Sequence, residues 1–309
     1  MNLHRGSRGP AVKVLETRLA RLLLLPASAV DRRYRAATVN SVRHFQWRMG
    51  LPATGRVNRR TWNLVAAEPG RRAALPAPII LGHRGQVTPG TGENTLEAMR
   101  QAAPNVSMLE FDLRLTADHE LVLMHDIGLD RTTNCTGRVA SWTLADLRAQ
   151  CRVGEQVIPT LDEVAAYAAS VGKSIAPDLK DTRMTNDDLA KVVSVIQAHG
   201  LANSAWVQSV YGSRFAELRR LEPRLRTVLV SRGIPSPSLV TAIGAAGVAI
   251  LVSSLTIPRV RAYHTAHLQV WGWTARTTPE LHMTKAMRAD GVVTDFPATA
   301  RALYHGRAF

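Results

Sequence analysis

Cysteine and long apolar runs are scarce in this chain of 309 residues. The two cysteines, Cys135 and Cys151, are too few for a zinc cluster or a disulfide framework. They either form one disulfide, which would indicate an oxidising compartment, or remain two reduced thiols. The longest leucine run, residues 22–25, ends at Pro26 and is far shorter than the roughly 18 residues of a membrane span, so we expect none. The first ten residues show no secretory signal, so export would use another route or the chain begins at a mature start.

Acidic side chains are scarce in one part of the chain only. Residues 1–75 hold three acidic and fifteen basic side chains, a net charge of +12, whereas the other 234 residues hold 21 acidic and 24 basic ones, a net of +3. A strongly basic region attracts polyanions such as nucleic acid, anionic lipid or anionic cell-wall polymer. Apolar residues make up 46% of the chain, which excludes a disordered protein. The length favours two folded units, because a typical domain has roughly 150 residues.

A segment rich in proline and arginine, residues 69–78, is interpreted as a linker between these two units. Before it, residues 10–24 and 38–49 carry apolar side chains at helical spacing, which predicts two helices. Asn58 is a good N-cap for a third, short helix. Residues 1–68 are therefore predicted to form a small three-helix bundle.

The N-terminal region resembles the peptidoglycan-binding type 1 domain. The motifs that carry the resemblance are Gly6 and Gly9, Phe45-Gln46, Gly50-Leu51, Thr54-Gly55 and Thr61-Trp62. Where that family usually has an Asp-Gly-x-Phe-Gly turn, this chain has Asp31 followed by Arg32, Arg33, Tyr34 and Arg35.

This resemblance implies that the region binds peptidoglycan, and we expect Arg32, Arg33, Tyr34 and Arg35 to contact the cell wall. It implies an extracellular or wall-associated protein, from a bacterium or a phage, without a nucleic-acid partner. The alternative is a bundle that only pads the rest of the chain.

Short β-rich runs alternate with helical segments through residues 79–309. Eight such runs are recognisable: 79–84, 108–113, 174–180, 205–210, 226–231, 248–254, 269–274 and 291–296. Helices are expected between them, including 161–171, 187–199 and 213–221. Eight strand–helix repeats in about 230 residues predict an α/β fold of the (β/α)8 TIM-barrel type. A ninth run, 121–126, follows the second strand after a turn too short for a helical crossover, so we interpret it as a hairpin return.

Polar side chains interrupt these apolar strands near their C-terminal ends, where barrels of this type carry their catalytic residues. They are His83 and Arg84 at the end of the first strand, Glu110 and Asp112 in the second, His125 at the end of the hairpin return, Asp178 and Lys180 at the end of the third, and Asp295 at the end of the last. Residues two apart in a strand point to the same side. We therefore expect Glu110 and Asp112, and likewise Asp178 and Lys180, to face the same opening of the barrel.

The acidic and basic members of this set favour a metal and a phosphate. Carboxylates such as Glu110, Asp112 and Asp178 suit a hard divalent cation, Ca²⁺ or Mg²⁺, better than zinc. Arg84 and Lys180 supply positive charge and hydrogen bonds that suit a phosphate group.

The two histidines, His83 and His125, titrate near neutral pH and can act as general base and general acid across a leaving group. A metal, two cations and an acid–base pair together indicate metal-dependent hydrolysis of a phosphodiester.

These residues lie in motifs that resemble the glycerophosphodiester phosphodiesterase family over residues 79–300. The motifs are His83-Arg84-Gly85, Glu93-Asn94-Thr95, Glu110-x-Asp112, His125-Asp126, Trp273-Thr274 and DGVVTDFP at 290–297. The resemblance implies that the two histidines are catalytic and that the three carboxylates bind the metal. It also implies a supporting role in the pocket for Glu93, Asn94, Trp273 and Asp295. The chain departs from the family at Asp178, which is usually Glu, and at Arg276, which is usually Asn.

The leading hypothesis is a metal-dependent phosphodiesterase held at the cell wall. Its substrate would be a deacylated phospholipid or the glycerol-phosphate polymer of wall teichoic acid. One alternative is a phospholipase D of the sphingomyelinase type, which shares the Asp-Leu-Lys sequence at 178–180 but which the retained Glu93-Asn94-Thr95 motif argues against. The other is a wall-binding protein with an inactive barrel, which the complete set of histidines and acids argues against.

Overall fold

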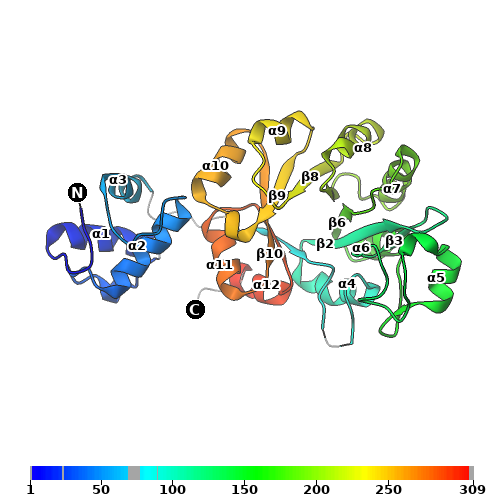
Figure 1. Cartoon of the computed structure of the whole chain (residues 1–309), viewed down its shortest axis with the longest axis horizontal. Helices are drawn as coiled ribbons and strands as arrows, with labels where there is room; N and C mark the ends of the chain where they lie inside the picture. Colours follow the sequence, from blue (N-terminus) through cyan, green and yellow to red (C-terminus); the bar gives the residue numbers. More distant parts are fainter. Residues whose placement is uncertain (1, 23, 69–76, 89, 306–309) are drawn as a thin grey trace. The chain divides into compact units, whose positions relative to one another are not determined.

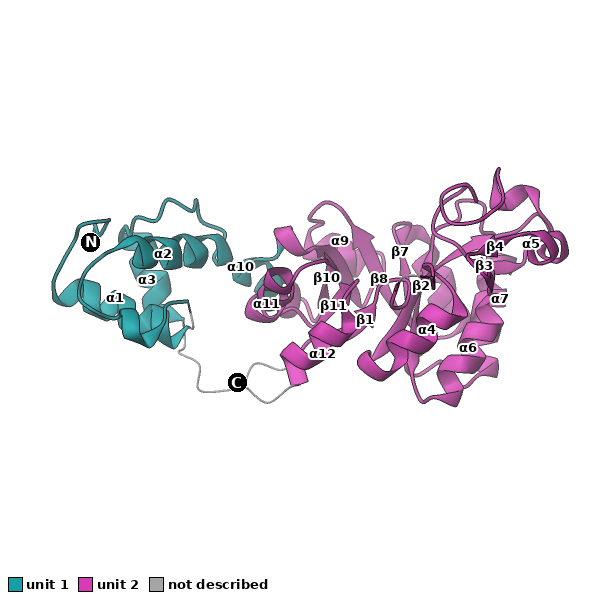
Figure 2. Cartoon of the chain, turned by 90° about the horizontal axis from the view of Figure 1, so that it is seen from below, with its two compact units in different colours: residues 1–76, 255–262 teal, residues 77–254, 263–309 magenta. Residues whose placement is uncertain are grey.

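The computed structural model describes residues 2–22, 24–68, 77–88 and 90–305 (Figure 1). The chain divides into two compact units, residues 1–76 with 255–262 and residues 77–254 with 263–309 (Figure 2). The predicted linker, residues 69–78, lies outside the described residues except for its last two. Helices dominate the first unit, and strands alternate with helices in the second.

The first unit contains the three predicted helices and one short 3₁₀ turn. They are α1 (Pro10–Arg21), η1 (Ala27–Ala29), α2 (Ala36–Arg48) and α3 (Arg59–Ala67). The apolar side chains at helical spacing are buried in its core: Val12, Leu15, Leu19, Val42, Phe45 and Val65. Asn58 caps α3 as expected, since its side-chain oxygen accepts a hydrogen bond from the Thr61 N–H at 2.8 Å.

A buried carboxylate ties the turn before α2 to α1. Glu16 accepts hydrogen bonds from the backbone N–H groups of Asp31 and Arg32 at 3.1 and 3.0 Å, and from the Thr38 hydroxyl at 2.9 Å. These three bonds supply the hydrogen-bond partners that a buried carboxylate requires, so Glu16 stabilises the interior of the bundle.

Eight parallel strands form the barrel of the second unit, as predicted. They are β1 (Ile79–Gly82), β2 (Met108–Leu115), β6 (Ser174–Leu179), β7 (Trp206–Ser209), β8 (Arg226–Ser231), β9 (Gly247–Leu251), β10 (Gln269–Ala275) and β11 (Gly291–Thr294). The sheet runs in the order β1-β11-β10-β9-β8-β7-β6-β2, and it closes because β1 also pairs with β2. The ninth run is β3 (Leu121–Leu123), which pairs antiparallel with the end of β2, so the predicted hairpin is confirmed.

Helices surround the strands in Figure 1. They are α4 (Leu96–Ala102), α5 (Leu144–Gln150), α6 (Leu161–Ser170), α7 (Asn186–Ala198), α8 (Phe215–Leu221), α9 (Pro237–Ala242), α11 (Thr278–Ala286) and α12 (Pro297–His305). Most of α10 (Ile257–Thr265) falls within residues 255–262, which are grouped with the first unit. Shorter elements complete the unit: η2 (Ala103–Asn105), η3 (Val139–Ser141), η4 (Gly212–Arg214), η5 (Val252–Ser254), and a two-stranded ribbon of β4 (Arg152–Val153) and β5 (Gln156–Val157). Thr160 and Thr185 begin α6 and α7 with capping boxes that satisfy the first N–H groups of each helix.

Inward-facing apolar side chains fill the barrel. One buried cluster draws on all eight strands or the residues beside them, among them Leu81, Met108, Ala176, Trp206, Val228, Ala249, Trp271 and Val293. Apolar packing of this kind makes the barrel a core and leaves the strand ends for polar side chains.

The segment between β3 and α6 has a separate small core. Cys135 and Cys151, which are 16 positions apart in the sequence, form a disulfide there, and this decides between the two states that the sequence left open. The bond joins the loop after β3 to the end of α5, and Cys151 packs with Val122, Leu129 and Leu147.

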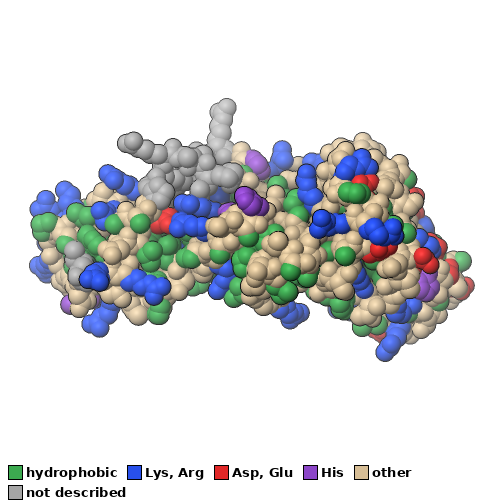
Figure 3. Space-filling model, turned by 90° about the horizontal axis from the view of Figure 1, so that it is seen from above, with side chains coloured by type: hydrophobic (Ala, Val, Ile, Leu, Met, Phe, Trp, Pro, Cys, Tyr) green, Lys and Arg blue, Asp and Glu red, His purple; other side chains and the backbone are tan. Residues whose placement is uncertain are grey.

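Charged side chains are distributed over the two units as the sequence indicates, with few acids in the first unit. On the face drawn in Figure 3, basic side chains are spread widely, whereas acidic side chains gather mainly over the second unit. Within the described ranges, no helix is both long enough and apolar enough to cross a membrane.

Candidate active site

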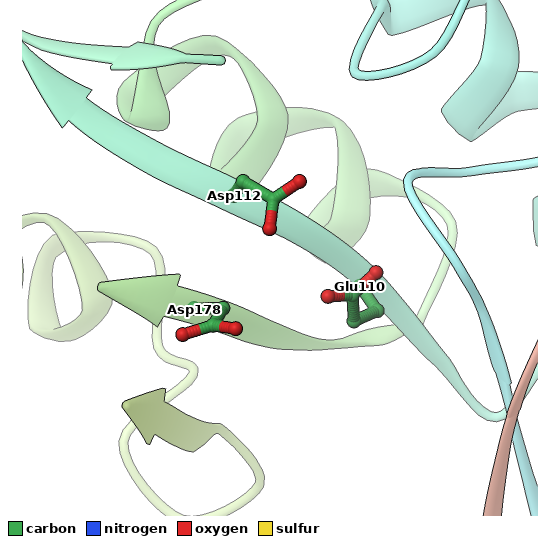
Figure 4. A group of neighbouring side chains, drawn as sticks. All are labelled: Glu110, Asp112 and Asp178. Atoms are coloured by element: carbon green, nitrogen blue, oxygen red, sulfur yellow. The ribbon is translucent and has the colours of Figure 1, made fainter. Parts of the chain in front are cut away.

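Three buried carboxylates from two neighbouring strands face one another (Figure 4). Asp112 on β2 lies opposite Asp178 on β6 in the register of the sheet, and Glu110 lies two residues before Asp112. One oxygen of each carboxylate lies within 4.8 Å of the others. The side chains are almost inaccessible to solvent, with exposed fractions of 4% for Glu110, 1% for Asp112 and 3% for Asp178.

The environment moves the pKa values of these carboxyl groups apart. Burial, together with the charge of Asp112, raises the pKa of Glu110 to about 7. Burial also raises the pKa of Asp178. Burial alone would raise the pKa of Asp112 too, but the positive charges of Lys180 and Arg84 lower it. Buried acids that repel one another in this way gain most from an added positive charge.

The donor set fits a hard divalent cation. All three residues offer carboxylate oxygens, which Ca²⁺ and Mg²⁺ prefer as ligands. Within the described part of the chain, Oδ1 of Asp178 is buried and accepts no hydrogen bond. A buried anionic oxygen without a partner is costly, and a cation bound among these residues would remove that cost.

The two cations predicted to bind phosphate both contact this group of acids. Arg84 donates its backbone N–H to Oε2 of Glu110 at 2.7 Å and holds its Nε atom 3.1 Å from Oδ2 of Asp112. Nζ of Lys180 lies 2.6 Å from Oδ2 of Asp178 and 3.4 Å from Oδ1 of Asp112. The structure therefore brings together five of the predicted site residues.

The backbone beside Arg84 adopts an unusual conformation that positions these contacts. Arg84 and Asn94 have φ values of +59° and +57°, in the left-handed region that residues other than glycine rarely adopt. Gly85 follows with φ of +91°, and a Cβ atom there would lie 2.7 Å from the backbone of Ala98. A glycine is therefore required where β1 turns towards α4.

Each residue of the Glu93-Asn94-Thr95 motif has a distinct contact. The Asn94 side chain donates to Oδ2 of Asp112 and accepts from the Asp112 N–H, both at 3.0 Å. Glu93 binds Arg84 at 2.8 Å, and Thr95 caps α4 by accepting from the Ala98 N–H at 3.1 Å. The motif thus fixes one metal-ligand candidate, one cation and the start of one helix.

Both histidines hold Nδ1 against a carboxylate. Nδ1 of His83 lies 2.6 Å from Oδ1 of Asp295, and Nδ1 of His125 lies 2.6 Å from Oδ1 of Asp126. Such a partner orients the imidazole and leaves Nε2 available for proton transfer. The positive charge of His83 also acts on Glu110, and that of His125 acts on Asp112 and Asp178.

A chain of ion pairs that sequence reasoning missed links His125 to Arg84. Arg131 donates from Nε to Oδ2 of Asp126 at 2.5 Å and from Nη2 to Oε1 of Glu93 at 2.5 Å. Burial alone would raise the pKa of Glu93, but hydrogen bonds and charges from Arg131 and Arg84 lower it. The available signal was the position of Arg131 five residues after Asp126, in a loop without periodicity.

Two further side chains lie at the C-terminal end of the barrel in different settings. Arg276, at the position where the family usually has Asn, places Nε 3.1 Å from Oδ2 of Asp295 and so adds a cation to the pair formed with His83. Trp273 packs against the barrel core and donates its indole N–H to the Ala249 carbonyl at 3.0 Å.

The predicted wall-contact residues of the first unit do not all lie on its surface. Arg32, Arg33 and Arg35 are exposed, and Arg35 pairs with Asp31 at 3.1 Å. Tyr34 is buried, and its hydroxyl donates to the Gly55 carbonyl at 2.8 Å. The prediction that Tyr34 contacts the wall is therefore wrong, because this ring belongs to the core of the bundle.

Comparison with known proteins identifies relatives of both units. The model of the glycerophosphoryl diester phosphodiesterase family matches residues 82–299, and that of a peptidoglycan binding domain matches residues 8–65. YhdW of Bacillus subtilis is 28% identical over 233 residues, which cover 71% of this chain and 94% of YhdW. A glycerophosphodiester phosphodiesterase of Caldanaerobacter subterraneus is 23% identical over 232 residues, covering 72% of this chain and 95% of that protein.

The solved structures that resemble the chain share its barrel. A phosphodiesterase of Oleispira antarctica, solved in complex with its product sn-glycerol-3-phosphate, matches with a TM-score of 0.67 at 22% identity. The match covers 73% of this chain and 96% of that one. Since the family match at residues 82–299 spans most of the sequence and contains every residue of the site described above, the chain belongs to the glycerophosphoryl diester phosphodiesterase family.

Proposed function

We propose that the second unit hydrolyses glycerophosphodiesters with His83 and His125 as its acid–base pair. The observation that carries this proposal is the arrangement of these two histidines, each held by a carboxylate at 2.6 Å. The charge of His83 acts on Glu110, and that of His125 acts on Asp112 and Asp178, so each ring acts on a member of the same group of buried acids. Two proton-transfer groups around one anion-binding site suit the displacement of an alcohol from phosphorus.

The reaction is a hydrolysis, in which one P–O bond forms and another breaks. One histidine removes a proton from the attacking water as its oxygen bonds to phosphorus. The other donates a proton to the alcohol oxygen as that oxygen leaves, so that the products are glycerol phosphate and a free alcohol. Arg84 and Lys180 hold the phosphoryl oxygens and stabilise the charge that develops on them.

Glu110, Asp112 and Asp178 would hold a divalent cation, Ca²⁺ or Mg²⁺. When bound, such an ion supplies a positive charge that polarises the phosphoryl group. Asp178 is one methylene shorter than the Glu usual in the family, so its carboxylate reaches less far from the strand.

A metal-exchange assay tests this part of the proposal. We expect the full chain to release choline from glycerophosphocholine, to lose activity with a chelator, and to recover it with Ca²⁺ or Mg²⁺. Asp112→Asn should require more metal for half-maximal activity, because it loses a charged ligand. Full activity after exhaustive chelation would contradict metal dependence, and cleavage of sphingomyelin in preference to glycerophosphocholine would favour the phospholipase alternative.

The first unit would attach the enzyme to the cell wall. Its match to a peptidoglycan binding domain supports this role, and so does its excess of basic side chains. The disulfide supports a location outside the cytosol, where such bonds persist. The substrate would then be the glycerol-phosphate polymer of teichoic acid or a deacylated phospholipid reaching the wall.

Deletion of residues 1–70 tests whether the two units divide the work. The truncated chain should hydrolyse glycerophosphocholine at close to the full rate, because every proposed catalytic residue lies beyond the deletion. It should lose activity on wall-bound teichoic acid, since attachment raises the effective concentration of that substrate. Thermal melting of both proteins controls for folding. An equal loss on both substrates, with the fold intact, would make the first unit part of the catalytic machinery.

A further inference from the structure

Three arginines line a pocket in the first unit, and none of the residues 32–35 of the basic turn lines it. Arg5, Arg43 and Arg56 surround a cavity of about 360 Å³. This volume falls in the range of small-molecule sites, roughly 300–1,000 Å³, and suits a small group better than a polymer strand.

Three segments far apart in the sequence form this pocket, and backbone hydrogen bonds fix them together. Leu3 and Val57 exchange N–H···O bonds of 3.0 and 2.8 Å, which places Arg5 and Arg56 on adjoining segments. Helix α2 contributes Arg43 one turn after Asn40. The three guanidinium groups are therefore carried by a scaffold that is already ordered, which reduces the entropy cost of binding.

Buried polar side chains hold the loop on the third side. Gln46 accepts from the Gly55 N–H at 2.8 Å and donates to the Arg56 carbonyl at 2.6 Å. The Tyr34 hydroxyl donates to the Gly55 carbonyl at 2.8 Å. Gly55 has φ of +70°, and a Cβ atom there would lie 2.8 Å from Val39 and 3.1 Å from Arg43. The loop can approach α2 this closely only because residue 55 is glycine.

The positive charge of the pocket is not neutralised by the first unit. Only three acids occur in residues 1–68, and none of them lines the cavity. Glu16 is bonded inside the bundle, Asp31 pairs with Arg35, and Glu68 pairs with Arg261. Across the described residues, no carboxylate forms an ion pair with any of the three pocket arginines.

We propose that this pocket binds a carboxylate group of the peptide part of peptidoglycan. The inference rests on the wall attachment proposed above and names its site and ligand. Arginine forks match the two oxygens of a carboxylate. Ala36 and Val39 add an apolar side to the pocket, and Asn40 adds an amide. A peptide offers the matching combination of carboxylate, apolar side chain and amide, whereas a glycerol-phosphate chain offers no apolar group.

Sedimentation of the full chain with purified peptidoglycan tests this assignment. The peptidoglycan is freed of teichoic acid by acid treatment, and a second sample has its carboxylates converted to amides. The Arg43→Gln/Arg56→Gln variant removes two charges from the pocket, and Arg59→Gln/Arg60→Gln removes two exposed charges of the same unit outside it. Hydrolysis of glycerophosphocholine by the same preparations reports the catalytic unit separately.

We expect the pocket variant to bind about tenfold more weakly or worse, since hydrogen bonds to charged groups contribute roughly 1.5–3 kcal/mol each. The Arg59→Gln/Arg60→Gln variant should bind within about twofold of the unchanged chain, and amidated peptidoglycan should bind poorly. Equal losses in both variants, or a larger loss in Arg32→Gln/Arg33→Gln, would overturn the pocket assignment while leaving wall attachment in place. Binding only to walls that retain teichoic acid would assign the pocket to phosphate instead. If the unchanged chain sediments with neither sample nor with whole walls, wall attachment itself is wrong.

Discussion

His83 and His125 have equivalent surroundings although they come from different loops. Each imidazole meets a carboxylate through Nδ1 at 2.6 Å, and each carboxylate also binds an arginine, Arg276 at Asp295 and Arg131 at Asp126. Because the arginine holds the second oxygen of each carboxylate, the carboxylate can keep the imidazole in one orientation. A fixed orientation suits proton transfer through Nε2.

Replacing either histidine should remove most of the activity. We expect His83→Ala and His125→Ala each to lower kcat for glycerophosphocholine by roughly 10²–10⁴-fold, the contribution typical of a general acid or base. Circular dichroism should show an unchanged barrel, since both side chains lie outside the apolar core. A rate near that of the unchanged chain in either variant would contradict the pairing.

Arg131 should act as a positioning residue for His125. Its hydrogen bond holds the pKa of Asp126 below the usual range, and the same side chain binds Glu93. We expect Arg131→Gln to lower kcat by roughly 10-fold, as is typical when an orienting contact is lost. The acid limb of the pH–rate profile should move to higher pH, because Asp126 would then protonate more readily. Arg131→Lys keeps the positive charge but loses the two-pronged guanidinium group, so its kcat should fall between those of the unchanged chain and Arg131→Gln. An unchanged rate and pH profile in Arg131→Gln would refute this role.

Metal affinity should depend on pH through Glu110. Its pKa is raised to about 7 by burial and by Asp112, so below that pH the carboxyl group holds a proton that an incoming cation must displace. Affinity for Ca²⁺ or Mg²⁺ should therefore rise between about pH 6 and about pH 8, with proton release near the lower value. Calorimetry in buffers of different ionisation enthalpy measures both quantities. Glu110→Gln, which cannot titrate, is the control, and equal affinity of the unchanged chain at both pH values would contradict the prediction.

The sequence predicted the acids and the histidines in recognisable motifs, but neither the carboxylate partners of the histidines nor the loop contacts. Glu110 and Asp112 share a face because residues alternate along a strand, and this periodicity is visible in the sequence. Arg131 reaches Glu93 across 38 positions, and only the folded path of the loop decides that contact. Tyr34 was misassigned for a similar reason, because its arginine neighbours suggested a surface and its own environment is the core.

At the scale of elements, the barrel was the most predictable part of the chain. The eight strands are short apolar runs at regular intervals, and each lies within a few residues of its predicted bounds. The two-residue strands β4 and β5 were missed, since so short a ribbon has no periodic pattern. The arginine pocket of the first unit was also missed, because its three walls come from separate segments.

The disulfide should stabilise the segment between β3 and α6. It closes a loop of 16 positions, for which the chain-entropy model gives about 3 kcal/mol. The Cys135→Ser/Cys151→Ser variant should therefore unfold at lower denaturant concentration than the oxidised chain. Addition of reductant should lower the denaturant midpoint of the unchanged chain to that of the variant. If the unfolding curve of the unchanged chain is the same with and without reductant, the bond contributes nothing to stability.

At the scale of the whole molecule, charge and chemistry are carried by different units. The basic excess belongs mainly to residues 1–75, whereas the histidines, the acids and the cations proposed to bind phosphate all belong to the barrel unit. Attachment through a basic unit should weaken as salt approaches about 1 M, where the Debye length is about 3 Å.

The most direct test follows the phosphorus of glycerophosphocholine by ³¹P NMR during incubation of the full chain with Ca²⁺ or Mg²⁺. We predict that the diester resonance is replaced by that of a phosphomonoester, glycerol phosphate, and that the His83→Ala chain leaves the diester intact over the same period. A diester resonance that persists with either cation, or that disappears equally fast in the His83→Ala chain, would contradict a phosphodiesterase built on this site.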